Sequence, residues 1–354
     1  MAGPAGPGGR AAGREWARPA ADPLPPTGLT LGLLGLLALC AAAAPLLSYT
    51  ASLALFGGAH VLFELRYVEA RFGDGPLRRL AVGVGLALAG VVGLRAAHAL
   101  GLWGGPAAAQ VELGLIAALA IMCAPALRAR SLGATVGLGL GLLALCVGLL
   151  IEPLLSMVAL AVLHNWTPAA FLAEALPPAA RRRGALLGAV AFVGLPLLIA
   201  SGLPVSALEA AAPSFASAAT SWGLPSAGPL RAHLGVYLPK AWHGAAQAPA
   251  LFAAVTFAQL VHYSVVIGIL PRVAPGGAGW PAPVGLSRPP AWVFALAVGV
   301  LSLIAAVGYW VDYGLARRWY GVIAAVHAWI EVPVLLLAFA GRAREGAAAS
   351  QAAG

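Results

Sequence analysis

Two pairs of a histidine and a glutamate, each four residues apart, lie inside strongly apolar stretches of this sequence. His60 precedes Glu64, and His327 precedes Glu331. In a helix, side chains four residues apart lie on one face, one turn apart, so each pair can act on a common ligand. Ionisable groups at bilayer depth are costly unless they find partners, which makes these residues candidates for a functional site.

Two further histidines, His164 and His262, lie in apolar stretches between the pairs. Neutral imidazole is the commonest metal ligand, and a carboxylate can complete the coordination sphere or orient a ligating histidine. Helix bundles build iron sites from histidines and carboxylates on facing helices, although the usual di-iron motif is ExxH and not HxxxE. We predict a site for iron or another transition metal. Its metal ligands would be His60, His164, His262 and His327, with Glu64 and Glu331 as catalytic carboxylates.

The composition predicts the elements that hold these residues. The chain has 354 residues, of which 61% are hydrophobic and only 9% charged, whereas soluble domains contain about 25% charged residues. Apolar runs of about 20 residues recur along the chain, as in polytopic helical membrane proteins. We therefore predict an all-α bundle of about ten transmembrane helices in a lipid bilayer. The expected spans are 28–48, 51–70, 79–101, 107–127, 132–151, 154–174, 184–203, 247–270, 291–311 and 318–340.

The basic residues predict how the bundle is oriented. The net charge is +9, but the basic residues are scattered in short loops, which favours membrane anchoring over nucleic-acid binding. With the N-terminus inside, all basic residues fall on the cytoplasmic side except Arg95, Arg231, Lys240, Arg317 and Arg318. This bias predicts cytoplasmic termini in a bacterial inner membrane. Residues 1–27 and 341–354 are the expected disordered cytoplasmic tails, flanking a transmembrane bundle over 28–340.

One long connection, residues 204–246, is predicted to lie outside. Its prolines and moderate hydrophobicity favour an interfacial segment or lid on the membrane. The segment Asn165-Trp166-Thr167-Pro168 predicts a helix kink, with Thr167 covering backbone groups that Pro168 frees.

The orientation gives each intramembrane polar residue a depth. Counted from the outer end of each span, the four histidines, the two glutamates and Gln259 differ by no more than about 9 Å along the bundle axis. They therefore share one layer near the middle of the bilayer. A single histidine in a membrane helix is more often a hydrogen-bonded packing residue, so the shared depth carries the prediction.

Three segments resemble one known family. His164-Asn165-Trp166-Thr167-Pro168, Gln259-Leu260-Val261-His262-Tyr263 and His327-Ala328-Trp329-Ile330-Glu331 each place one histidine in a separate helix. This loosely resembles the Brp/Blh-type membrane β-carotene 15,15′-dioxygenases, over scattered motifs and not over the whole chain. The resemblance implies that the four histidines hold a non-haem iron that splits a carotenoid. The family's first motif reads PHG followed by an Asp, whereas this chain has Ala59-His60-Val61 with Glu64.

Three functions fit these features. The leading one is a membrane metalloenzyme, a non-haem iron oxygenase or oxidoreductase acting on a lipophilic substrate. The second is a proton-coupled transporter in which His/Glu pairs relay protons, although the sequence shows no inverted repeat. The third is an electron carrier with a haem between two axial histidines, which leaves the glutamates unexplained.

Overall fold

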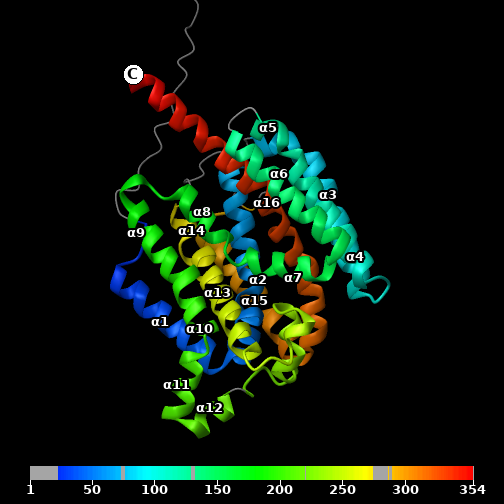
Figure 1. The fold of residues 1–354 in the computed structure, drawn as a ribbon, viewed down its shortest axis with the longest axis vertical. Helices are drawn as coiled ribbons and strands as arrows, with labels where there is room; N and C mark the ends of the chain where they lie inside the picture. Colours follow the sequence, from blue (N-terminus) through cyan, green and yellow to red (C-terminus); the bar gives the residue numbers. More distant parts are fainter. Residues whose placement is uncertain are drawn as a thin grey trace, which may run out of the picture.

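The computed structural model describes residues 23–72, 76–128, 132–219, 221–273, 286 and 289–353 (Figure 1). Every regular element in this described part is helical. Residues 1–22 of the expected N-terminal tail lie outside the described residues. The helices are α1 (Thr27–Ala43), α2 (Pro45–Phe72), α3 (Pro76–Ala99), α4 (Gly105–Met122), α5 (Ala124–Arg128), α6 (Leu132–Ile151), α7 (Pro153–His164), α8 (Thr167–Ala175), α9 (Pro178–Ala189), α10 (Leu195–Ala200), α11 (Leu203–Ala211), α12 (Pro213–Ala219), α13 (Ala248–Gly268), α14 (Leu270–Val273), α15 (Ala291–Val311) and α16 (Tyr313–Ala353).

Eight helical segments in the described residues are long and apolar enough to cross a membrane, which confirms a polytopic helical membrane protein. They are Pro45–Phe72, Leu77–Ala99, Gly105–Leu127, Pro153–Ala175, Pro178–Ala200, Ala248–Val273, Ala291–Val311 and Tyr313–Ala338. The other two predicted spans correspond to shorter apolar helices, Thr27–Ala43 and Thr135–Ile151. The number of ten spans is therefore not confirmed. The backbone of residues 341–353 continues helix α16.

Proline sets several of the helix boundaries. Pro45 and Pro153 open α2 and α7 directly after the preceding helix ends. Proline suits the first turn of a helix, where its missing N–H has no intrahelical partner to lose. The predicted kink is present, because α7 ends at His164 and α8 begins at Thr167. The Thr167 hydroxyl lies 2.7 Å from the His164 carbonyl oxygen, as expected for a side chain that covers a freed backbone group.

Three helices form the centre of the bundle. The membrane-crossing segments of α2, α13 and α16 are 56%, 72% and 50% buried, against 11–39% for the other five. In Figure 1, α1, α9 and α10 flank this centre on one side and α3, α4 and α6 on the other. The centre therefore carries His60 and Glu64, His262, and the pair His327 and Glu331 on its three most buried helices.

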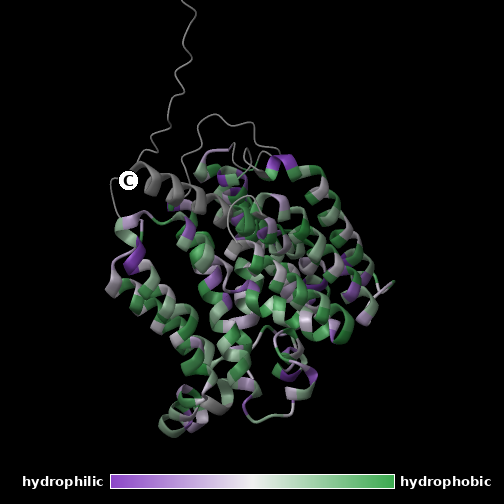
Figure 2. Ribbon diagram, turned by 45° about the horizontal axis from the view of Figure 1, so that its top comes forward, coloured by the Kyte–Doolittle hydropathy of each residue, from purple (hydrophilic) through white to green (hydrophobic). Residues whose placement is uncertain are grey.

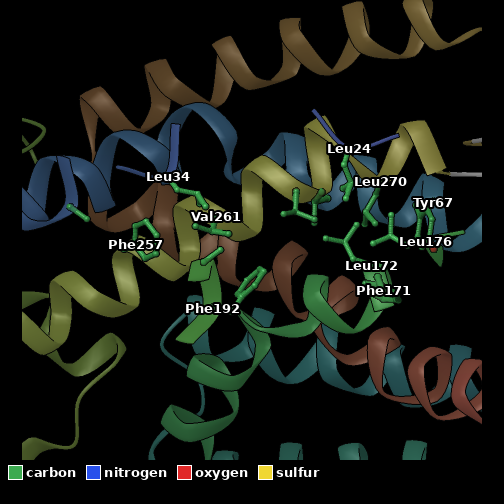
Figure 3. Packing of buried hydrophobic residues seen from close by; sticks show 14 of the residues in the cluster. Leu24, Leu34, Tyr67, Phe171, Leu172, Leu176, Phe192, Phe257, Val261 and Leu270 are labelled. Carbon is green, nitrogen blue, oxygen red and sulfur yellow. The ribbon is translucent and has the colours of Figure 1, made fainter. Parts of the chain in front are cut away.

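The bundle is apolar inside and outside. Its largest buried cluster joins α2, α8 and α13, with Phe171, Phe257 and Leu270 fully buried (Figure 3). The helices are predominantly hydrophobic along their length (Figure 2), and many large hydrophobic side chains are exposed, such as Val82 at 78% and Leu150 at 75%. Such a surface is typical of a protein whose solvent is a lipid bilayer.

Part of the 204–246 segment packs on the end of the central helices. It contains α11, α12 and three short 3-10 helices, Leu230–Ala232, Leu234–Val236 and Lys240–Trp242. Leu234, Tyr237 and Leu238 are buried in one cluster with Tyr49 of α2, Phe252 of α13 and Tyr313 of α16. The segment thus closes the bundle at the end where α16 begins.

Candidate metal centre

The structure brings together all four histidines that the sequence singles out. One ring nitrogen from each lies within 4.8 Å of one from every other, and we call this group the histidine cluster: His60, His164, His262 and His327. They come from α2, α7, α13 and α16. Three of them are 2% exposed or less, and the fourth, His164, is partly buried. The cluster can hold a metal ion.

The spacing inside the cluster fits a shared ion. The Nε2 atom of His327 lies 3.0 Å from Nε2 of His60 and 3.1 Å from Nε2 of His164. Two imidazole nitrogens bound at about 2.0–2.1 Å from one metal lie roughly 2.9 Å apart at a right angle and roughly 3.4 Å apart in a tetrahedron. The two Nε2–Nε2 separations fall within that range.

Hydrogen bonds outside the cluster fix two of its tautomers. His60 Nδ1 lies 3.2 Å from the Phe56 carbonyl oxygen, and only an N–H can donate to a carbonyl. His164 Nδ1 lies 2.7 Å from Glu331 Oε2 and donates to that carboxylate. In both neutral rings the Nε2 atom therefore carries a lone pair that points into the cluster.

These tautomers leave an electrostatic conflict that a cation resolves. His327 Nε2 lies next to both lone pairs, and it can carry only one proton. At most one of the two short contacts can then be a directed hydrogen bond, and the other brings a lone pair against a nitrogen that offers it no proton. A metal ion between the nitrogens would turn both contacts into bonds. This is the chemical reason to regard the cluster as a metal site and not as packing.

Two glutamates complete the site, but one of them supports a different histidine than its spacing suggests. Glu331 accepts from His164 on α7 and lies 2.6 Å from the Thr167 hydroxyl. It does not hold His327, one turn before it on α16, because the break between α7 and α8 brings His164 and Thr167 to its carboxylate.

The second carboxylate is the most enclosed. Glu64 is fully buried beside the His262 ring and the Glu331 carboxyl group. Its Oε2 atom lies 3.7 Å from His262 Nε2, and Glu331 is the acidic residue that interacts with it most strongly. Two neighbouring buried carboxyl groups are costly to ionise together, and a divalent cation would stabilise their ionised form.

Gln259 does not lie with these groups. Its side-chain amide donates to Ser52 Oγ at 2.9 Å, and its carbonyl oxygen accepts from the Tyr237 hydroxyl. It thus faces the end of the bundle that the 204–246 segment closes. The sequence reasoning also missed Tyr263, whose ring stacks on His60 with 4.1 Å between ring centroids.

A cavity of about 220 Å³, the central cavity, adjoins the histidine cluster. It touches His60, His164 and His327 at one end and reaches Tyr237, Arg317 and Tyr320. The space exists because α16 presents Gly321, Ala324 and Ala328 to it, which have little or no side chain. Sequence reasoning assigned Arg317 only to the outer surface. Tyr313, Arg317 and Tyr320 are spaced four and three residues apart, so they lie on one face of a helix. This spacing could have indicated that Arg317 faces the bundle together with the two tyrosines.

No family model matches this chain, and neither a curated protein nor a solved structure matches it. The fold and the site therefore define its class by themselves. It is a multi-pass helical membrane protein with a buried cluster of histidines and glutamates that can hold a metal ion.

Proposed function

We propose that the protein is a membrane-embedded metalloenzyme, a non-haem iron oxygenase that oxidises a lipophilic substrate with O₂. The observation that carries the proposal is the pair of short Nε2–Nε2 contacts around His327, which a single Nε2–H proton cannot satisfy as two directed hydrogen bonds. Histidine nitrogens with nearby carboxylates suit iron among the transition metals. The site lies in the apolar bundle, which favours a substrate that enters from the bilayer.

The chain's own residues have separable tasks in this proposal. His60, His164 and His327 would bind the metal through Nε2, and His262 would complete the set after a small approach. Glu331 orients His164 through Nδ1–H and raises its basicity. Iron held this way supplies O₂ activation when bound. The central cavity beside the histidine cluster is where a substrate would lie.

The resemblance to the Brp/Blh-type dioxygenases supports a carotenoid-like substrate and remains a prediction. Cleavage of one carbon–carbon double bond by O₂ gives two aldehydes and consumes both oxygen atoms, so it balances without a further reductant. A buried cluster beside a cavity is compatible with that chemistry.

The geometry favours this proposal over the haem alternative. An axial pair must lie on opposite faces of a macrocycle. Here the rings of His60 and His164 are packed against the His327 ring, with centroids 4.7 and 4.8 Å apart. This packing leaves no room for a macrocycle between them.

Metal analysis with an optical spectrum of the purified protein tests the proposal. We expect iron in a stoichiometric amount, no Soret band, and loss of activity on chelation that Fe²⁺ restores. A Soret band would replace the proposal by the haem carrier. A protein purified without metal, and unable to take it up, would favour the proton-coupled transporter. Stoichiometric zinc in place of iron would keep the metal site and exclude the oxygenase.

We also propose that the bundle lies in a bacterial inner membrane with both termini cytoplasmic. The test uses single cysteines in a background without the native ones, at Ser221 beyond α10 and at Arg182 in the first turns of α9, both exposed. A membrane-impermeant maleimide should label Ser221→Cys in intact cells and Arg182→Cys only after lysis. The opposite pattern would invert the orientation.

A further inference from the structure

Arg317 differs from the other arginine of the central cavity. Arg95 donates to Glu112 at 2.7 Å, and its charge is thereby compensated. Arg317 is partly buried in the first turns of α16, and none of the carboxylates in the described ranges forms an ion pair with it. Its electrostatic neighbours are tyrosines, with Tyr49 the strongest. A guanidinium enclosed among tyrosines without a carboxylate can accept a counter-charge, so its surroundings point to an anionic ligand.

The other residues that line the central cavity also carry no negative charge that could pair with Arg317. The residues that line it include the two arginines and Tyr49, Tyr237 and Tyr320, but no aspartate or glutamate. Guanidinium groups only donate hydrogen bonds, and the hydroxyls of Tyr49 and Tyr320 can donate as well, whereas that of Tyr237 already donates to Gln259. The wall near Arg317 is therefore suited to an anionic oxygen acceptor. One uncompensated arginine matches the single charge of a carboxylate, which it can bind through two parallel hydrogen bonds.

The cavity connects this arginine to the histidine cluster. Arg317 and His327 are ten residues apart on α16, which is about 15 Å along a helix. Gly321, Ala324 and Ala328 line the path between them. The volume of about 220 Å³ is below the roughly 300–1,000 Å³ of pockets that enclose a whole ligand of moderate size. The cavity thus fits the polar end of a longer molecule whose chain continues into the bilayer.

We propose that Arg317 binds the carboxylate of a lipophilic acid and holds it with its carbon chain directed to the histidine cluster. This inference rests on the proposed function and deepens it, because it names the substrate class of the same site. A carotenoid that is a plain hydrocarbon offers nothing to Arg317, whereas a carotenoid-like chain that ends in a carboxylate supplies the missing counter-charge. Binding of the acid requires Arg317 and the cavity, and it does not require the metal.

Equilibrium binding of radiolabelled palmitate to the full-length protein in phosphatidylcholine nanodiscs tests the inference. Unlabelled palmitate should displace the label, and 1-hexadecanol and methyl palmitate at equal concentration should not. Arg317→Ala should weaken palmitate binding roughly 10–100-fold, because a hydrogen-bonded ion pair is lost. Arg318→Ala is the matched control, since it removes the same charge from an exposed neighbour that does not line the cavity. Its binding should equal that of the wild type.

A second variant protects the test against loss of folding. A Cβ at Gly321 would meet open space and Gly321 lines the cavity, so Gly321→Leu should occupy the cavity. It should lose palmitate binding while keeping the unfolding temperature of the wild type. Equal competition by 1-hexadecanol, or palmitate binding unchanged in Arg317→Ala or in a folded Gly321→Leu variant, would overturn the inference. Preferential displacement by dioleoyl phosphatidic acid would overturn it too, since the anion would then be a phosphate.

Failure of this inference can be told from failure of the proposed function. Palmitate binding is measured before and after chelation, with the metal content of the same sample determined. Arg317-dependent binding in a protein that holds no metal would keep the acid site and remove the oxygenase. Stoichiometric iron without Arg317-dependent palmitate binding would keep the oxygenase and remove the acid site.

Discussion

Replacing His327 by alanine should abolish stoichiometric metal binding and, with it, activity. His327 Nε2 lies between the Nε2 atoms of His60 and His164, at 3.0 and 3.1 Å, so its loss removes the central ligand. The affinity should fall far more than the roughly 10–100-fold expected for a residue that only orients a ligand. Insertion should persist, because the change removes polarity from an apolar helix. Metal content and chelator competition measure the effect.

Thermal unfolding gives a second readout of the same variant. A metal present at a hundred times its dissociation constant stabilises the wild type by about 2.7 kcal/mol, so chelation should lower its unfolding temperature. The unfolding temperature of His327→Ala should not respond to the chelator. His98→Ala is the control, because His98 is exposed on α3, outside the histidine cluster. Normal metal content in His327→Ala would end the metalloenzyme proposal.

Glu331→Gln should weaken metal binding by roughly 10–100-fold, the usual effect of removing a partner that orients a ligand. The amide oxygen of glutamine can still accept from His164 Nδ1–H, and its amino group can donate to the Thr167 hydroxyl. The variant therefore keeps the shape of the network and removes the group that can ionise. Because Glu331 contacts His164, the substitution should weaken metal binding by His164 and leave metal binding by His327 unaffected.

Glu152→Gln is the matched control for this variant. Glu152 is exposed just before α7, so the same loss of charge should leave metal affinity unchanged. A proton-coupled carrier gives a different pattern, in which Glu331→Gln abolishes the pH dependence of transport and no metal is involved. A pure packing role gives a third, in which activity is retained and stability changes by about 0.6–2 kcal/mol.

The sequence by itself determined the helical membrane class and the common depth of the polar residues. The low charge and long apolar runs left no soluble alternative. Helix rise is constant, so positions within spans translate into depths, and four histidines that share a depth in the sequence also meet in space. The position of Pro168 likewise predicted the break between α7 and α8, which falls at Asn165 and Trp166.

The tertiary structure decided what depends on the rotation and pairing of helices. A linear pattern gives no neighbour across an interface, so the contact of Glu331 with His164 and that of Gln259 with Tyr237 and Ser52 could not be predicted. The cavity follows from small residues on one face of α16 meeting small residues and tyrosines of other helices. Arg317 looked like a surface anchor because its charge placed it outside. The packing of α2, α16 and the 204–246 segment encloses Arg317 among tyrosines. In the described chain, Arg317 forms no ion pair with a carboxylate.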